Sequence, residues 1–324
     1  MKKILCTVAL VSVAGSVFAG PLDKTECIAG AKPGGGFDLT CKLAQTALYE
    51  GKYIKDPMRV TYMPGGIGAV AYNAVVAQRP GEPNTIVAFS GGSLLNLAQG
   101  KFGKYTESDV RWLSVVGADY GAVVVRKDSP IKNLKDLAAA LKADSTKVVF
   151  GAGGTIGSQD WMKAALTARA AGLNHKQMRF VAFEGGGEAI SALQGGHVHV
   201  YSGDASEAAS QIKAGANIRV IAVMADKRLP GELASVPTAK EQGFDVEWPI
   251  VRGFYVGPKV SDADFKVWTD TFDKMMKTKE YAKLLEERGL YPMALTGTEL
   301  DAYVKRTTHN YRKLAEEFGL AGAK

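Results

Sequence analysis

The groups best placed for chemistry in this sequence are five glycine-rich turns, each directly after an apolar, strand-like stretch. Glycine lets a backbone approach a ligand closely, and free N–H groups at the start of a following helix bind anions. A single turn of this kind is more often only a tight turn, whereas five in one chain indicate a shared site for a negatively charged ligand. The turns contain residues 34–36, 65–68, 91–92, 151–157 and 185–187.

The common signatures of catalysis are missing from the sequence. Residues 66–71 fit the dinucleotide pattern G-x-G-x-x-A, but no acidic residue ends the next strand-like stretch. There is no Walker lysine, no G-x-S-x-G and no H-E-x-x-H. His197 and His199 lack a third metal ligand, and Asp204 with Glu207 is more simply explained as a solvated loop than as an acid–base pair. We therefore expect a binding protein that is not an enzyme and uses no cofactor or metal.

The elements that position these turns alternate along the chain. Strand, glycine turn and helix recur in that order, which predicts an α/β fold with its ligand outside the carboxyl ends of the strands. Asn133 is expected to cap a helix, and Ser261 starts a helical C-terminal region. The expected strands are 25–29, 58–63, 85–89, 120–126, 147–150, 179–183, 197–202 and 219–224; the expected helices are 39–50, 69–78, 94–99, 133–142, 159–171, 188–194 and 300–318.

Composition places the chain among ordinary globular proteins. It has 324 residues, 46% of them hydrophobic and 23% charged. This composition excludes a chain that is disordered, or a coiled coil, over its whole length. The net charge of +7 is scattered and forms no Lys/Arg-rich run, so we expect no nucleic-acid partner. The length is that of about two domains.

The N-terminus predicts export. A basic start at residues 1–3, an apolar stretch at 4–18 and small residues around Ala19 are typical of a signal peptide over 1–19, cleaved after Ala19. The apolar stretch is short for a membrane span, which needs about 20 residues. We therefore expect an exported, soluble protein.

Export also changes how the cysteines are interpreted. Without Cys6 the chain keeps Cys27 and Cys41, and an even pair in an oxidising compartment is a disulfide candidate. Two buried free thiols are the alternative. We favour the disulfide, because a strand end and the first turn of the next helix bring the two residues close.

The order of five motifs resembles a known family. The motifs are K-P-G-G-G-F-D at 32–38, M-P-G-G-I-G at 63–68, G-A-G-G-T-I-G-S at 151–158, F-E-G-G-G at 183–187 and P-T-A-K-E-Q-G at 237–243. Together they resemble the periplasmic substrate-binding proteins of the tripartite tricarboxylate transporters, over essentially the whole mature chain. Residues 88–97 and 248–261 are similar to the citrate-binding member of that family.

The resemblance implies a two-domain periplasmic-binding-protein-like fold. Each domain would be a mostly parallel sheet flanked by helices, and two strands would cross between the domains. Domain 1 would contain 20–121 plus 226–324, and domain 2 would contain 122–225.

The resemblance also implies where the ligand is held. The family anchors one carboxylate at the first two glycine turns, which here are Gly35, Gly36, Phe37 and Asp38, and Pro64, Gly65, Gly66, Ile67 and Gly68. The opposite wall would be Gly154, Thr155, Ile156, Gly157 and Ser158, with Phe183, Glu184, Gly185 and Gly186. Less specific candidates are Ser90, Ser93, Tyr120, Ser202, Asp204 and Arg252.

Two of these side chains have an equally good structural explanation. Asp38 is expected to be the N-cap of its helix, and beside an anionic ligand it would repel unless water intervenes or it accepts from a ligand hydroxyl. Arg252 would offer a positive charge to a tricarboxylate, and a structural ion pair is the alternative.

The function expected from these observations is capture of citrate or a related tricarboxylate in an interdomain cleft. A monomer would close on the ligand and deliver it to the membrane permease subunits of a tripartite transporter. The alternatives are a dicarboxylate, an aromatic carboxylate or an amino acid as ligand, or a ligand sensor that acts through a sensor kinase.

Overall fold

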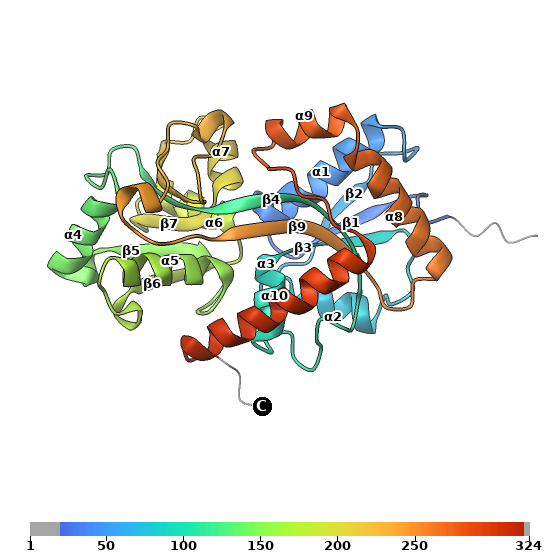
Figure 1. The fold of residues 1–324 in the computed structure, drawn as a ribbon, viewed down its shortest axis with the longest axis horizontal. Helices are drawn as coiled ribbons and strands as arrows, with labels where there is room; N and C mark the ends of the chain where they lie inside the picture. The colour runs from blue at the N-terminus through green and yellow to red at the C-terminus, as the bar shows by residue number, and fades with distance from the viewer. Residues whose placement is uncertain (1–19, 321–324) are drawn as a thin grey trace, which may run out of the picture.

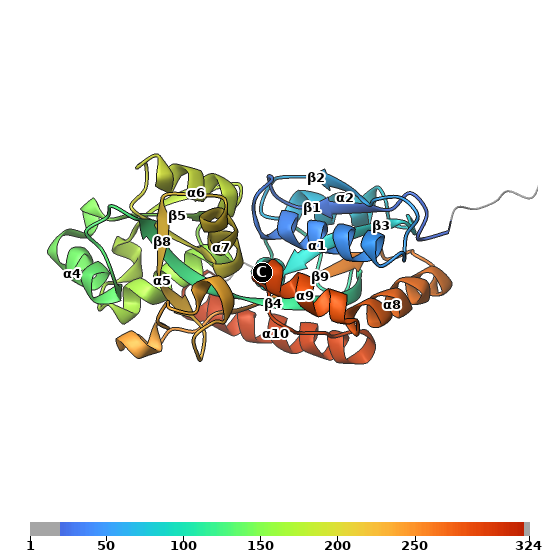
Figure 2. The same ribbon diagram turned by 90° about the horizontal axis from the view of Figure 1, so that it is seen from above.

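The computed structural model describes residues 20–320. The expected signal peptide, residues 1–19, and its cleavage site lie outside the described residues. Within the described range, nine strands form one continuous sheet with helices on both faces (Figure 1; Figure 2). No helix of this range is long and apolar enough to cross a membrane.

The order of strands and helices along the chain follows the expected alternation. The strands are β1 (Glu26–Ala29), β2 (Arg59–Tyr62), β3 (Thr85–Ser90), β4 (Arg111–Arg126), β5 (Val149–Gly153), β6 (Arg179–Phe183), β7 (Val200–Asp204), β8 (Ile218–Met224) and β9 (Pro249–Val256). The helices are α1 (Gly36–Glu50), α2 (Ala69–Ala77), α3 (Gly91–Ala98), α4 (Leu134–Asp144), α5 (Gln159–Ala170), α6 (Gly186–Gln194), α7 (Ala205–Lys213), α8 (Asp262–Met276), α9 (Lys279–Glu287) and α10 (Gly297–Glu317).

The pairing of the strands divides the sheet into two flanks and a centre. The order is β2-β1-β3-β9-β4-β7-β5-β6, and β8 also pairs with β4. Each flank is parallel, whereas all pairs made by β4 and β9 are antiparallel. The sheet is therefore mixed, and β4 and β9 run between the two halves of the molecule (Figure 1). The α/β class and the two crossing strands are as expected, and the domain boundaries at 121/122 and 225/226 stay a prediction.

Strand β4 begins at Arg111, well before the expected start at Tyr120. Nearly all of its residues are buried, so it lacks the alternation of apolar and polar residues that marks a half-exposed strand. Its length lets it pair with β9 in one half and with β7 and β8 in the other.

Alternate residues of each flank face opposite layers of helices. Cys27 packs in a cluster with α1 and α8, whereas its neighbour Ile28 packs in a cluster with α2 and α3. In the other half Val123 faces α4 and α5, and Val124 faces α6 and α7. This period of two builds a three-layer sandwich in each half.

The C-terminal helix α10 extends along both halves (Figure 1; Figure 2). Near its C-terminus the ring of Tyr311 stacks on that of Trp248 at 5.9 Å. Glu317 accepts from Arg169 Nη1 on α5 at 3.0 Å. The C-terminal part of α10 is therefore part of the contact between the halves.

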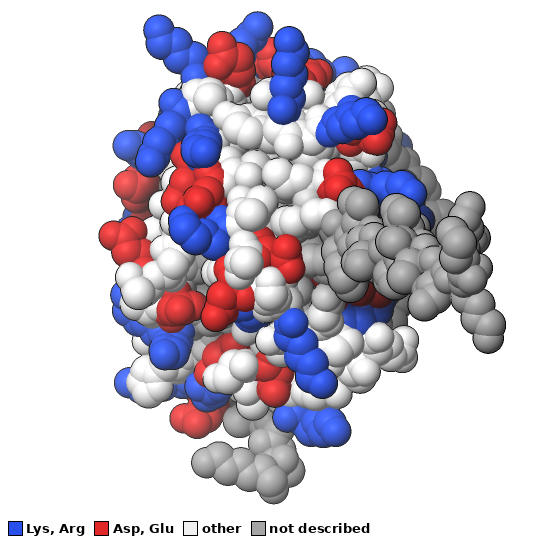
Figure 3. All heavy atoms as spheres, turned by 90° about the vertical axis from the view of Figure 1, so that its right-hand side faces the viewer, with Lys and Arg blue, Asp and Glu red and all other residues white. Residues whose placement is uncertain are grey.

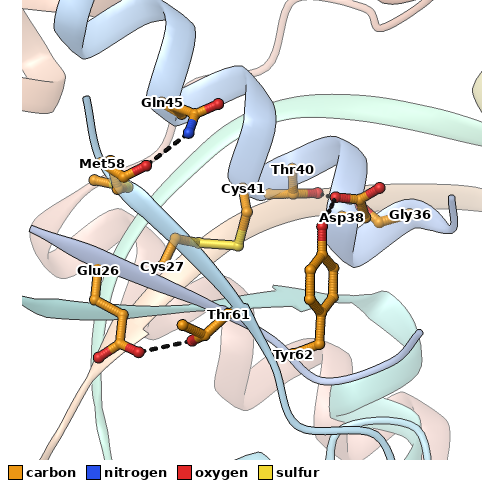
Figure 4. The surroundings of a disulfide bond; sticks show 10 residues. All are labelled: Glu26, Cys27, Gly36, Asp38, Thr40, Cys41, Gln45, Met58, Thr61 and Tyr62. Atoms are coloured by element: carbon orange, nitrogen blue, oxygen red, sulfur yellow. Dashed lines mark hydrogen bonds between the residues drawn. A yellow bond between two sulfur atoms is a disulfide. The ribbon is translucent and has the colours of Figure 1, made fainter. Parts of the chain in front are cut away.

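Cys27 and Cys41 form a disulfide that joins β1 to α1, as expected (Figure 4). Both side chains are fully buried directly behind the first glycine turn. The bond therefore ties the strand before that turn to the helix after it.

The surface at the end of the molecule shown in Figure 3 carries blue and red side chains interspersed. No large patch of one sign appears on the described residues of that face. The scattered charge of the sequence is thus a mixed, solvated surface there.

Candidate functional site

Five helices begin at the carboxyl ends of strands and point their N-termini at one place between the two halves. They are α1 and α3 from one half and α5, α6 and α7 from the other. Each N-terminus leaves backbone N–H groups without helical partners and carries a partial positive charge. Their convergence brings five partial positive charges to one point, an arrangement that favours an anion.

Two adjoining cavities occupy this place. The inner cavity measures about 40 Å³ and forms the floor, and the outer one measures about 410 Å³. Ile67, Asn96 and Ser158 line both. The other lining residues of the floor are Ala31, Gly35, Gly36, Phe37, Ser90, Gly92, Gly153, Gln159, Asp160, Gly185, Gly186, Asp204, Glu207 and Arg252; those of the outer cavity are Gly66, Lys101, Gly154, Thr155, Ala182, Phe183, Glu184 and Glu188.

Turns from the two halves touch around these cavities. A Cβ at Gly187 would lie 2.8 Å from the carbonyl oxygen of Pro33, and a Cβ at Gly154 would lie 2.8 Å from Ile67 Cγ1. Lys101 Nζ donates to the carbonyl of Ile156 at 2.6 Å. The cavities are therefore enclosed by residues of both halves, as in a closed binding cleft.

The floor contains a buried network of charges. Arg252, on the crossing strand β9, donates from Nη2 to Asp119 Oδ2 at 2.7 Å and also to Asp204 Oδ2. Lys163, on α5, binds Asp204 Oδ1 at 2.5 Å and Asp160 Oδ1 at 2.7 Å. The two cations are 2% and 0% exposed, so each is committed to carboxylates of the protein itself. The structural ion pair, left open from the sequence, is what the structure shows for Arg252.

Glu207 extends from the first turn of α7 into the same floor. Its Oε2 accepts a hydrogen bond from the buried Tyr201 hydroxyl. Its other oxygen, Oε1, faces the start of α1, where a Cβ at Gly35 would lie 3.6 Å away. Asp204 and Glu207 are both buried, so the expectation of a solvated loop at these residues is wrong. Asp204 ends strand β7 and Glu207 lies in the first turn of α7, and both elements place their side chains in the interior.

Burial and neighbouring charges move the acidities of this network in opposite directions. Burial, with the charges of Asp204 and Asp160, raises the pKa of Glu207 to about 8. Burial also raises the pKa of Asp160. Burial alone would raise the pKa of Asp204, but the ion pairs with Lys163 and Arg252 outweigh this effect and hold its pKa below the usual value. One carboxyl of the floor is thus protonated at neutral pH while another is firmly ionised.

Three helices begin inside glycine turns, earlier than the sequence predicted. At two of these starts only glycine fits beside the floor: a Cβ at Gly36 would lie 2.0 Å from Arg252 Nη1, and one at Gly186 would lie 1.8 Å from Glu207 Oε2. These glycines make room for the protein's own charged side chains. The observed and expected starts are Gly36 against Leu39 for α1, Gly91 against Leu94 for α3, and Gly186 against Glu188 for α6.

The second glycine turn is strained. Ile67 has φ +47°, a left-handed conformation that a β-branched residue rarely adopts, and it lies between glycines with φ +59° and +93°. Its side chain reaches Gly154 across the cleft. The turn thus presents an apolar side chain at the boundary of the two cavities.

Asp38 lies inside the first turn of α1, so its expected role as N-cap residue is wrong; Gly35 holds that position and has no capping side chain. Because the helix begins earlier, the Asp38 carboxylate reaches back to the N–H of Gly34 at 2.8 Å. It also accepts from Lys42 Nζ at 2.8 Å. The Tyr62 hydroxyl donates to its other oxygen, also at 2.8 Å (Figure 4). Asp38 therefore stabilises the first glycine turn through hydrogen bonds on the side away from the cavities.

Most residues expected at the site line one of the two cavities. These are Gly35, Gly36, Phe37, Gly66, Ile67, Ser90, Gly154, Thr155, Ser158, Phe183, Glu184, Gly185, Gly186, Asp204 and Arg252. Asp38, Pro64, Gly65, Gly68, Ser93, Tyr120, Ile156, Gly157 and Ser202 lie away from the walls. Ser93 instead forms a capping box with Ser90, and Tyr120 packs edge-on against Tyr291.

Several residues of the site were not expected from the sequence. Asn96, Lys101, Gln159 and Asp160 line the cavities from the helices that follow the glycine turns, or from just beyond them. The side-chain carbonyls of Asn96 and Gln159 are buried without a hydrogen-bond partner within 20–320. Their signal was position alone: Asn96, Gln159 and Asp160 lie within a turn or two of a glycine-rich helix start, and Lys101 lies just after the end of α3.

A groove of about 750 Å³ elsewhere in the molecule is a poorer candidate. It lies between α7 and α9 and is lined by the C-terminal end of α9 and the residues after it, such as Arg288 and Leu290. A helix C-terminus carries a partial negative charge, which disfavours an anion. Within 20–320 no group of three His, Cys, Asp or Glu residues is arranged to hold a metal ion.

Residues 104–320 match the family profile described as tripartite tricarboxylate transporter family receptor. A Cupriavidus necator protein, named UPF0065 protein in gbd 5'region, is 24% identical over 314 residues, which cover 94% of this chain and 90% of the relative. The periplasmic binding protein BugD is similar in structure with a TM-score of 0.81 at 18% identity, covering 92% of this chain and 98% of BugD. MatC from Rhodopseudomonas palustris, solved with bound malate, has a TM-score of 0.77 at 18% identity, covering 90% of this chain and 99% of MatC. The fold is therefore that of the periplasmic binding proteins.

Proposed function

Because the chain belongs to the tripartite tricarboxylate transporter family of receptors, we propose that its cleft captures a tricarboxylate of the citrate class for delivery to membrane permease subunits. Members of this family are periplasmic solute-binding proteins for small carboxylates. The observation that carries the proposal is the convergence of five helix N-termini, from both halves, on one pair of cavities.

The size and lining of the outer cavity support a small, polar ligand. Its volume of about 410 Å³ lies within the range of small-molecule sites, about 300–1,000 Å³. Its walls offer the hydroxyl of Thr155, the amide of Asn96 and the ammonium group of Lys101, whereas the hydroxyl of Ser158 already donates to the carbonyl of Gly153. Desolvation of that ammonium group lowers the pKa of Lys101 to about 8, so it is cationic at neutral pH.

Neutral donors and helix dipoles would supply most of the affinity, because Arg252 and Lys163 are paired with carboxylates of the protein. Closure of the two halves around the ligand would complete the cleft, since both halves supply its walls. A dicarboxylate is the second candidate, favoured by the malate bound in the structurally similar MatC.

A thermal-unfolding screen of the mature protein tests the proposal. Citrate, isocitrate, tricarballylate, malate, adipate, succinate and glutamate would be added one at a time at pH 7. A specific ligand raises the melting temperature by mass action, by an amount that grows with its concentration. No shift with any carboxylate would contradict the proposal.

A matched pair of variants connects the shift to the cleft. Asn96, which is 3% exposed and lines both cavities, is changed in Asn96→Ala; the exposed Asn310 on α10 is changed in Asn310→Ala. Loss of one buried hydrogen-bonding group costs about 1–3 kcal/mol, so Asn96→Ala should weaken binding by roughly 5- to 150-fold. Asn310→Ala should bind like the wild type.

A further inference from the structure

Glu207 has a free oxygen in the floor of the cleft. The side chain is 95% buried by its neighbours, with 5% exposed, and one oxygen accepts from Tyr201. The other, Oε1, has no hydrogen-bond partner within 20–320 and lies beside Gly35 at the start of α1. Glu207 is therefore a buried polar group aimed at the point where an incoming anion meets the helix N-termini.

The floor already contains more carboxyl groups than cations. Arg252 and Lys163 each contact two aspartates, and no cation is left over for Glu207 among the described residues of the floor. From α1 and α6 only glycine backbone faces it. The titratable and charged groups around it are Tyr201 and Asp204 on β7, Asp160 and Lys163 on α5, Asp119 on β4 and Arg252 on β9.

The inner cavity has room for one carboxylate of a ligand. At about 10–15 Å³ for each water-sized group, its 40 Å³ holds about three such groups, and a carboxylate has three heavy atoms. A carboxylate in this cavity would lie against Glu207 Oε1. Two carboxyl groups at hydrogen-bond distance in a buried site strongly disfavour double ionisation, so they share a proton.

We propose that Glu207 binds the ligand carboxylate as the protonated acid, so that the occupied cleft always holds one proton between Glu207 and the ligand. The proton on Oε1 is donated to a ligand oxygen, while Oε2 continues to accept from Tyr201. Where Glu207 is already protonated no covalent bond changes; where it is ionised, a proton from the solvent or buffer forms the O–H bond at Oε1. The inference rests on the proposed function and adds to it a binding group and a second, protonic ligand.

The acidity of Glu207 supports this assignment and sets the pH range. With a pKa of about 8, roughly nine tenths of the free protein holds the proton at pH 7 and about one tenth at pH 9. Proton uptake on binding should therefore be about 0.1 at pH 7 and approach about 0.9 at pH 9. Affinity should fall by about tenfold for each pH unit above 8.

Titration calorimetry of the full-length mature protein measures this uptake directly. Citrate, tricarballylate, malate and adipate are titrated at pH 7 and pH 9, each in two buffers of different ionisation enthalpy. The difference in observed heat gives the number of protons taken up. Uptake near 0.9 at pH 9 supports the proposal, and uptake below about 0.2 with binding intact overturns it while leaving the proposed function in place.

Three variants identify the group that takes up the proton. Glu207→Gln should bind the ligand with an affinity that no longer falls above pH 8, and should take up no proton on binding at pH 9. Glu232→Gln, a change at an exposed residue, should behave like the wild type. Lys101, which also lines the cleft and has a pKa of about 8, is the rival source. Uptake that persists in Glu207→Gln and disappears in Lys101→Met assigns the proton to the lysine and overturns the proposal.

A further variant, Tyr201→Phe, tests the proposal even if Glu207→Gln does not fold. The hydrogen bond from Tyr201 stabilises the ionised form of Glu207, so Tyr201→Phe should shift the loss of affinity to higher pH. An unshifted or downward-shifted pH profile in that variant counts against the proposal. If no carboxylate binds at any pH from 6 to 9, the proposed function and this inference both fall.

Discussion

Replacing Lys163 by methionine tests the physical account of the cleft floor. The lysine is fully buried, and its Nζ lies 2.7 Å from Asp160 Oδ1 and 2.5 Å from Asp204 Oδ1. Methionine keeps most of the side-chain volume but removes the positive charge that pairs with the buried carboxylates of Asp160 and Asp204. Removing one partner of a buried ion pair costs about 3–5 kcal/mol. In the variant, Asp204 still accepts from Arg252, and Asp160 still accepts from the N–H of Gly153. We therefore expect the free energy of unfolding to fall by about 3 kcal/mol at pH 8, the lower end of that range.

The pH dependence of this loss separates a charge effect from a packing effect. Without Lys163 the folded-state pKa of the orphaned carboxyl rises above its unfolded value. The native state then binds more protons than the unfolded state, so the variant gains stability as pH falls, by about 1.4 kcal/mol per unit below the raised pKa. The deficit relative to the wild type should therefore shrink between pH 8 and pH 5.

Urea unfolding of the wild type and Lys163→Met at pH 8, 6.5 and 5 measures the deficit. The control is Lys266→Met, whose ammonium group pairs with Asp270 at 2.8 Å on the exposed face of α8 and should change stability by less than about 1 kcal/mol. A Lys163→Met variant within about 1 kcal/mol of the wild type at pH 8, or a deficit that grows toward pH 5, would refute the reasoning.

Three further outcomes follow from the same structure. Replacing Cys27 and Cys41 by alanine should lower the free energy of unfolding by about 3 kcal/mol, the value for a disulfide that closes a loop of this length. Urea unfolding of the variant and the wild type under reducing and oxidising conditions measures this difference. Equal stability of the two proteins would contradict a structural disulfide. Glu207→Gln should remove a pH-dependent loss of stability: the raised pKa of Glu207 makes the wild type less stable as pH rises from about 5 to 8, and thermal melts of the variant should lack that part of the slope. Gly186→Ala should be destabilised by about 1–3 kcal/mol and lose ligand binding, because its Cβ would lie 1.8 Å from Glu207 Oε2; calorimetry showing normal binding would contradict the packing described for the floor.

The sequence was sufficient to locate the glycine turns but not to explain them. Gly36 and Gly186 were expected to make room for a ligand, whereas the space beside them holds Arg252 and Glu207. Those two side chains come from β9 and α7, far from the turns along the chain. Local patterns contain no information about which distant side chain packs against a turn, so the charged floor could not be derived from them.

The fold was predictable where local periodicity and composition agree. Parallel strands with helices between them follow from the alternation of apolar runs and glycine turns. The early start of β4 at Arg111 and of α1 at Gly36 did not follow, because β4 is buried on both faces and glycine is a weak helix former. In both cases tertiary contacts outweigh the local preference of the residues.

A crystal structure of residues 20–324 with citrate, and with malate if citrate does not bind, is the most direct test of the proposed ligand site. The account predicts one ligand molecule in the outer cavity, with a carboxylate in the floor among the starts of α1, α3, α5, α6 and α7 and beside Glu207. A ligand bound instead in the groove between α7 and α9, or a cleft that stays without ligand at saturating concentration, would contradict it.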